Sequence, residues 1–277
     1  MDKEDSIIKY NILTFIGNDK IFENSLLPKI INLYEYFSNS KFVLYICVNN
    51  KFSDIEKIDN LLKTHKSLRN LNFSYHIFET INKGADIGGY FELLKKVKEV
   101  NDNTIKYNIF THTKSDDSWR ESLLSSILTP ESLLNFEQIL QLNDNIGIYG
   151  EHRWLKSSYK AYHSNKQLKL GRFESKQIFE NNFETINSLF KIQFEKETLD
   201  NYFFIAGTMF IFSNKLIEFI YPEIDNCYAL LPLYDYWRPS GKDIIGFEYT
   251  FERWLGCLCH HLGLLVSSKK KLIKFRV

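Results

Sequence analysis

The first 150 residues alternate between short apolar runs and longer amphipathic segments, and this alternation restricts the chain to few folds. The apolar runs have the length of buried strands, and the segments between them carry apolar residues at helical spacing. We expect strands at Ile12–Ile16, Phe42–Val48, Phe73–Phe78, Ile105–Thr111 and Ile146–Tyr149. Strands that alternate with helices form parallel βαβ units. The sequence therefore predicts an α/β fold with a Rossmann-like, open, mostly parallel sheet and helices on both faces.

The remaining elements complete one predicted domain over residues 1–277, with a regular half at 1–150 and a less regular half at 151–277. Residues 151–200 give few strand signals. The run at Tyr202–Phe212 predicts a strand with a small-residue break at Ala206–Thr208, and Ile244–Leu265 predicts a long helix. Earlier helices are expected at Leu26–Phe37, Asp54–Leu62, Tyr90–Val100, Trp119–Leu128 and Pro130–Leu142.

Composition excludes several classes of protein. The 35 basic residues nearly cancel the 34 acidic ones, which argues against a nucleic-acid partner. Four unevenly spaced cysteines do not form a disulfide framework and favour a reducing compartment. We find neither a signal-peptide pattern nor the ~18–20 consecutive apolar residues of a membrane span. We therefore expect a cytoplasmic protein.

Polar and glycine residues gather where the predicted strands end, and in an open parallel sheet the ligand crevice lies at that edge. After the third strand the chain reads NKGADIGGY. Gly84, Gly88 and Gly89 would let the backbone approach a ligand, and the following helix N-terminus would favour a diphosphate, with Lys83 adding charge. Asp86 either accepts hydrogen bonds from a sugar hydroxyl or caps the helix. The alternative is an ordinary polar loop.

The fourth strand leads into a second polar stretch, THTKSDDSWR. Lys114 can bind phosphate as a point charge, as can His112 when it is protonated. For either residue taken singly, the simpler interpretation is a solvated loop residue for Lys114 and a packed residue for His112. Arg120 lies in a first helical turn, where the helix dipole disfavours a cation, and can reach a phosphate. Asp116 and Asp117 either cap this helix, which we favour, or coordinate Mg²⁺ or Mn²⁺.

Taken in order, these stretches resemble the rhamnan-synthesis-protein-F family of polysaccharide glycosyltransferases. The matching parts are N-K-G-x-D-I-G, a strand ending in H-T-K, W-R before a leucine-rich helix, FFIAGTMFIF at 203–212 and FERWLG at 251–256. The resemblance implies a GT-A-like hexosyl- or deoxyhexosyltransferase. Such an enzyme moves a sugar from a nucleotide-sugar donor to a glycan or lipid-linked glycan acceptor in cell-surface polysaccharide synthesis. It also implies that the half 1–150 binds the donor and the half 151–277 faces the acceptor.

The resemblance also assigns candidate site residues. Many GT-A enzymes hold a metal with Asp-x-Asp, whereas the corresponding strand end here reads His-Thr-Lys. We therefore expect no metal requirement, with Mn²⁺ or Mg²⁺ on Asp116 and Asp117 as the alternative. The donor-binding candidates are Asn82, Lys83, Gly84, Asp86, Gly88, Gly89, His112, Lys114 and Arg120, and the acceptor-binding candidates are Gly207, Thr208, Tyr236 and Trp237.

An inverting transferase needs a carboxylate that takes a proton from the acceptor hydroxyl. Glu248 and Glu252 lie four residues apart and share one face of the last predicted helix. The structural alternative is an exposed Glu248 and an ion-paired Glu252 beside Arg253. Asp235 or Asp243, in the aromatic loop before the helix, is a third possibility.

Three further features carry alternatives. The aromatic loop Tyr228–Arg238 either stacks on sugars or serves the core. Cys257, Cys259 and the pair His260 and His261 lack a second ligand pair at zinc spacing, so we expect core cysteines and keep the histidines as minor phosphate candidates. The basic tail SSKKKLIKFRV lies on an anionic membrane surface, is solvated, or forms an edge strand.

Two other functions compete with glycosyl transfer. One is a non-catalytic module that binds a sugar or nucleotide, which would bind without turnover. The other is a nucleotidyltransferase-like Rossmann enzyme, which would need a metal.

Overall fold

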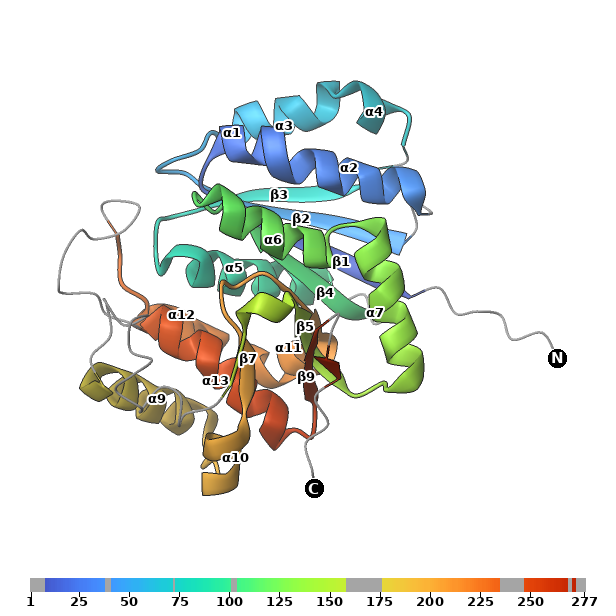
Figure 1. The fold of residues 1–277 in the computed structure, drawn as a ribbon. Helices are drawn as coiled ribbons and strands as arrows, with labels where there is room; N and C mark the ends of the chain where they lie inside the picture. The colour runs from blue at the N-terminus through green and yellow to red at the C-terminus, as the bar shows by residue number, and fades with distance from the viewer. Residues whose placement is uncertain are drawn as a thin grey trace.

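One eight-stranded sheet forms the centre of the protein (Figure 1). The computed structural model describes residues 8–37, 41–71, 73–100, 104–157, 176–234, 247–268 and 271–272. The strand order is β10-β9-β5-β8-β4-β1-β2-β3. The strands are β1 (Lys9–Ile16), β2 (Phe42–Asn49), β3 (Tyr75–Thr80), β4 (Ile105–His112), β5 (Ile146–Gly150), β8 (Phe210–Ser213), β9 (Leu265–Ser268) and β10 (Lys271–Leu272).

The sheet is mostly parallel. Strands β1 to β4 pair in parallel with one another, and β5 pairs in parallel with β9. Only β8 and β10, among the strands of this sheet that the structure describes, run antiparallel to their neighbours. The predicted α/β class with a Rossmann-like, mostly parallel sheet is confirmed.

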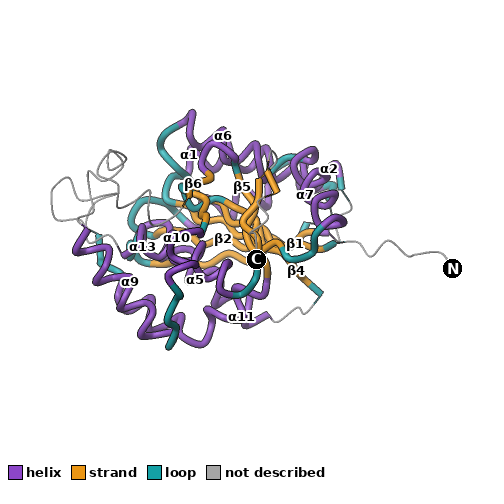
Figure 2. The backbone as a smooth tube through the Cα atoms, turned by 60° about the horizontal axis from the view of Figure 1, so that its bottom comes forward, coloured by secondary structure: helices purple, strands orange, loops and turns teal. Residues whose placement is uncertain are grey.

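Helices cover both faces of the sheet, as predicted (Figure 2). Side chains alternate along a strand, so in β1 Tyr10 and Ile12 enter one hydrophobic cluster while Leu13 and Phe15 enter the other. Burial on both faces explains the continuous apolar runs of these strands. The first cluster is covered by η1 (Phe22–Leu26), α2 (Leu27–Tyr36), α3 (Ile55–Thr64), α6 (Asp117–Ile127) and α7 (Pro130–Leu142), and the second by α5 (Ala85–Val100), α9 (Lys176–Phe190), α11 (Asn214–Ile220), α12 (Ile224–Leu230) and α13 (Phe247–His261).

The small elements are helical turns at the edges of these layers and one two-stranded ribbon. Helix α10 ends directly before the ribbon strand β7. The elements are α1 (Asp19–Ile21), α4 (Lys66–Arg69), η3 (His152–Trp154), α10 (Lys196–Asn201), η5 (Tyr221–Glu223), β6 (Leu155–Ser157) and β7 (Phe203–Ile205).

The prediction of one strand over Tyr202–Phe212 is wrong. The chain breaks at the small residues, so β7 pairs antiparallel with β6 and β8 enters the central sheet. Gly207 and Thr208 at the break have φ values of +106° and +52°. Such left-handed backbone cannot continue a strand. Residues 176–190 and 196–201 are helical where few strand signals were expected.

The C-terminal segment joins the sheet edge. Ser267 and Ser268 are buried in β9, and Lys271–Leu272 form β10, which matches the edge-strand alternative for the start of the tail. The rest of the tail, 273–277, lies outside the described residues. None of the helices in the described part of the chain is long and apolar enough to cross a membrane.

Candidate functional site

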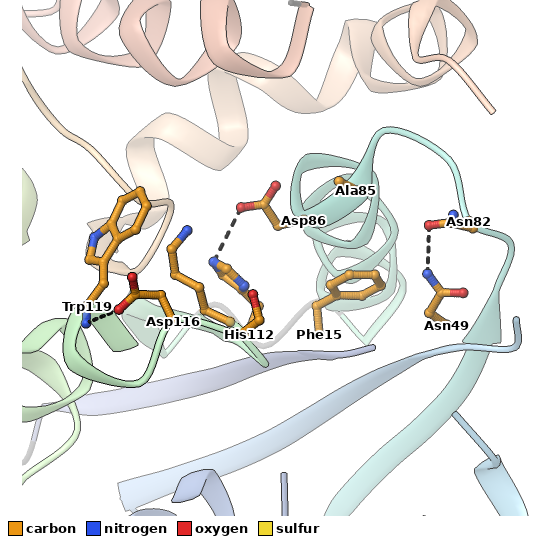
Figure 3. Close-up of a pocket in the computed structure, with 10 residues that line it drawn as sticks. Phe15, Asn49, Asn82, Ala85, Asp86, His112, Asp116 and Trp119 are labelled. Carbon is orange, nitrogen blue, oxygen red and sulfur yellow. Dashed lines mark hydrogen bonds and ion pairs between the residues drawn. The ribbon is translucent and has the colours of Figure 1, made fainter. Parts of the chain in front are cut away.

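A pocket of about 270 Å³ lies at the carboxyl edge of the parallel strands (Figure 3). The strand ends supply much of its wall, and the first turns of α5 and α6 complete it, so the crevice predicted at this edge is present. The lining residues are Phe15, Asn49, Asn82, Ala85, Asp86, His112, Lys114, Ser115, Asp116 and Trp119. Four of the donor-binding candidates, Asn82, Asp86, His112 and Lys114, are thereby brought together.

The glycines approach the protein itself instead of lining this pocket. A Cβ on Gly88 would lie 1.6 Å from the Lys83 carbonyl oxygen, and one on Gly89 would lie 2.2 Å from the Phe15 ring. Gly84 has a φ of +62°, and a Cβ there would meet Leu231 at 2.5 Å. The predicted close backbone approach is therefore real, but it seats α5 against β1 and the segment before Tyr234. These glycines therefore fix the position of α5, whose first turn lines the pocket, and do not themselves line it.

Asp86 and His112 face each other across the pocket wall (Figure 3). Asp86 Oδ2 lies 3.3 Å from His112 Nε2, and the same nitrogen lies 3.1 Å from the Gly207 carbonyl oxygen. Asp86 sits inside the first turn of α5, so it is not the N-cap residue that the alternative interpretation proposed. His112 is buried as the last residue of β4.

Lys114 is a buried cation at the pocket. Its Nζ lies 3.5 Å from the centre of the Trp119 ring, a cation–π contact. Arg120 donates to the Lys114 carbonyl oxygen, to Ser25 Oγ at 3.2 Å and to Asp117 at 2.7 Å. Arg120, expected to reach a phosphate, instead lies behind the lining residues and holds the loop that carries Lys114.

Two other charged candidates also have structural partners. Asp116 caps α6 by accepting the Trp119 backbone N–H at 2.8 Å, as favoured, and this bond lowers the pKa of Asp116. Lys83 Nζ lies 4.6 Å from the centre of the Tyr228 ring and therefore faces α12. The residues that the structure describes include no group of three or more His, Cys, Asp or Glu side chains able to hold a metal.

An amide pair forms the wall at β2 and β3, and sequence reasoning named Asn82 but missed Asn49. Asn49 Nδ2 donates to Asn82 Oδ1 at 2.9 Å. Asn82 in turn donates to the Tyr234 carbonyl oxygen at 2.7 Å, and the Tyr234 N–H donates back to the Asn82 carbonyl oxygen at 2.9 Å. Phe15 and Asn49 were detectable only as residues at or just after predicted strand ends, and Trp119 only as part of the W-R stretch.

Glu248 and Glu252, the predicted bases, lie behind the pocket wall. Both are buried, which contradicts an exposed Glu248. The Tyr234 hydroxyl donates to Glu248. Glu252 Oε1 accepts from Gly207 N at 2.7 Å and from Thr208 N and Oγ1 at 2.8 Å each. Burial raises the pKa of Glu252, and the charge of Arg253 opposes that shift.

The remaining candidates lie elsewhere. Gly207 and Thr208, predicted to bind acceptor, form the buried turn held by Glu252, whereas Asp235, Tyr236, Trp237 and Asp243 lie outside the described residues. Near the far end of α13, Cys257 and Cys259 are core residues whose thiol pKa values are raised by burial. His260 Nδ1 lies 3.0 Å from Thr198 Oγ1, and His261 packs on Phe194.

Comparisons with known proteins give weak structural likenesses and no match in sequence. No protein-family profile matches the sequence, and no curated protein matches it. Among solved structures, core-mannan synthase A from Aspergillus fumigatus in its Mn- and GDP-form is similar at 8% sequence identity and a TM-score of 0.29. The alignment covers 94% of this chain and 68% of that chain. A TM-score this low carries no conclusion about the chemistry of the pocket.

Proposed function

We propose that the protein is a glycosyltransferase that moves a hexosyl or deoxyhexosyl group from a nucleotide-sugar to a glycan acceptor. The observation that carries this proposal is the buried Lys114 in the lining of a pocket that the first turns of α5 and α6 also line. A cation and two helix N-termini suit a diphosphate. The Asp86 carboxylate suits the hydroxyls of a sugar.

The convergence of separate motifs supports the same function. The NKGADIGG, HTK and WR stretches supply Asn82, Asp86, His112, Lys114 and Trp119 to one pocket. The AGT and ER stretches meet directly behind it through Glu252. These are the stretches that resemble the rhamnan-synthesis-protein-F family, so we propose a role in cell-surface polysaccharide synthesis.

The proposed chemistry uses protein charge in place of a metal. Breaking the bond between the sugar and the diphosphate leaves negative charge on the nucleotide, which the transition state must stabilise. Lys114 is the pocket residue suited to that role. Phe15 offers a ring and Asn49 and Asn82 offer amides at the β1–β3 side, which suit a nucleobase. A metal on Asp116 and Asp117 is the competing version, and it would have to displace the α6 cap that Asp116 forms.

The proposed acceptor also suggests where in the cell the protein acts. A lipid-linked glycan would place the enzyme at the inner face of the cytoplasmic membrane. The basic residues within 267–277 would contact its anionic lipids. Flotation with vesicles that contain phosphatidylglycerol, compared with neutral vesicles, tests this contact.

A thermal-shift screen of UDP-, GDP-, TDP- and CMP-sugars, in EDTA and in Mn²⁺, tests the function. We expect one nucleotide class to stabilise the protein in EDTA, and Lys114→Ala to abolish that shift. Lys66→Ala is the matched control. Lys66 is exposed on α4, which precedes β3 and therefore lies at the amino ends of the parallel strands, away from the pocket.

Three outcomes separate the alternatives. Absence of a shift with every donor contradicts the proposed function. Stabilisation and turnover that collapse in EDTA and recover with Mn²⁺ contradict the metal-free version alone. Binding without turnover favours a non-catalytic sugar- or nucleotide-binding module.

A further inference from the structure

A chain of polar contacts connects Glu252, behind the pocket, with Asp86 on its wall. Glu252 Oε1 accepts the backbone N–H groups of Gly207 and Thr208 and the Thr208 hydroxyl, at 2.7–2.8 Å. The Gly207 carbonyl oxygen lies 3.1 Å from His112 Nε2. That nitrogen lies 3.3 Å from Asp86 Oδ2. Residues from α13, the 206–209 turn, β4 and α5 thus share one network.

The partners of His112 define its tautomer. A backbone carbonyl oxygen and a carboxylate oxygen are both acceptors, so we infer that His112 Nε2 carries the hydrogen. The Gly207 carbonyl oxygen sets the ring orientation from one side. His112 in turn holds the Asp86 carboxylate against the pocket, where 20% of its side chain is exposed.

The turn at the centre of this network has an unfavourable backbone. Thr208 is β-branched and has a φ of +52°, a region that such residues rarely adopt. It persists only where the surroundings hold it, and such strain gathers at functional sites. Here the three hydrogen bonds to one buried Glu252 oxygen hold it. Glu252 thereby determines where the Gly207 carbonyl oxygen points.

We propose that Asp86 is the general base of the transfer and that Glu252 is a positioning residue that acts on it through the 207–208 turn and His112. This inference rests on the proposed function. The acceptor oxygen forms a bond to the sugar C1 while its proton passes to the Asp86 carboxylate. The bond between C1 and the diphosphate oxygen breaks, and its electron pair leaves with the nucleoside diphosphate. C1 is inverted.

Placement favours Asp86 over the carboxylates of α13. Asp86 lines the pocket beside Lys114, so a base and a cation for the leaving group lie at one cavity. Glu252 Oε1 already accepts three hydrogen bonds, and Glu248 accepts from the Tyr234 hydroxyl. A base must reach the proton that it removes.

The first experiment tests the network without any ligand. In protein labelled with ¹⁵N-histidine, long-range ¹H–¹⁵N NMR should show His112 as the Nε2–H tautomer. Glu252→Ala should shift these His112 signals, and Glu252→Gln should restore them, because its amide oxygen can accept the same three bonds. A His112 that carries its hydrogen on Nδ1, or signals that do not change in Glu252→Ala, would overturn the positioning role.

The second experiment follows nucleoside diphosphate release from UDP-, GDP- and TDP-sugars, with water in place of the acceptor. Asp86→Asn keeps an acceptor for His112 and for a sugar hydroxyl, so it should still bind the donor. Its rate should fall by about 10²–10⁴-fold. Formate should restore release in Asp86→Ala, and Glu252→Gln should recover most of the rate that Glu252→Ala loses. Asp144→Asn is the control, because Asp144 is exposed in the loop before β5 and therefore lies at the amino end of that strand, away from the pocket.

The outcomes separate this inference from the function on which it rests. A wild-type protein that binds and releases none of these donors contradicts the proposed function, and with it the assignment of a base. Wild-type release with an unimpaired Asp86→Asn variant, or retention of the C1 configuration in the product, overturns the base alone. A loss in Glu248→Gln without one in Asp86→Asn returns the base to α13.

Discussion

The Thr208 turn gives the sharpest test of the packing behind the pocket, because two substitutions remove the same hydroxyl and differ in backbone cost. Thr208 is buried, and its hydroxyl donates to Glu252 Oε1 at 2.8 Å. Loss of a buried hydrogen bond to a charged group costs about 1.5–3 kcal/mol. A residue with a Cβ in the left-handed region costs roughly 1–2 kcal/mol that glycine does not.

We therefore expect Thr208→Ala to lower the free energy of unfolding by about 2–3 kcal/mol and Thr208→Gly to lower it by about 1 kcal/mol less. Thr208→Ser keeps the hydroxyl and should lose only the burial of one methyl group, about 0.8 kcal/mol. The order of stability should be wild type, Ser, Gly, Ala.

Urea unfolding followed by tryptophan fluorescence measures these differences. An alanine variant as stable as the glycine variant, or more stable, would refute the reasoning, since it would mean that the left-handed backbone at residue 208 carries no cost. A serine variant as unstable as alanine would show that the hydroxyl bond to Glu252 contributes nothing.

Two other substitutions test neighbouring features. Gly88→Ala should lower the free energy of unfolding by about 3 kcal/mol or prevent folding, because its Cβ would lie 1.6 Å from a backbone oxygen. Gly263→Ala, at a φ of +67° but in open space, should lower it by about 1–2 kcal/mol. Equal melting temperatures for the two variants would contradict this prediction. Burial raises the pKa of Glu252 from its ordinary 4.5, so the native state binds this proton more tightly than the unfolded chain does. Relative to Glu252→Gln, the wild type should be most stable below pH 4.5 and lose stability as pH rises through the raised value. A stability difference that does not vary across acid and neutral pH would contradict this second prediction.

The strands and several helix starts could be read from the sequence because they depend on local physics. A strand buried on both faces must be apolar along its whole length, and β1, β2, β4 and β5 were each predicted within a few residues. The capping role of Asp116 and the start of α7 at Pro130 follow from backbone N–H groups within the same turn. The position of the pocket follows from the common direction of parallel strands.

The residues that meet at the pocket depended on contacts between distant parts of the chain. Helical spacing showed that Glu248 and Glu252 share a face of α13, but not that Glu252 would hold a turn more than forty residues earlier. The glycine-rich stretch showed that a backbone comes close to something, and only the packed structure showed that Phe15, Leu231 and the Lys83 carbonyl are what it approaches.

The sequence alone therefore determined the class of fold and the edge of the sheet where a ligand would bind, because periodicity and turn chemistry record burial and direction along the chain. Tertiary structure decided which side chains line the pocket and which are buried behind it in hydrogen bonds with other parts of the protein. Asp86 and His112 lie 26 positions apart, and Gly207 and Glu252 lie further along; only folding brings them into one network of hydrogen bonds and an ion-pair contact. The physical reason is that a partner across the fold is selected by three-dimensional distance, which local sequence does not encode.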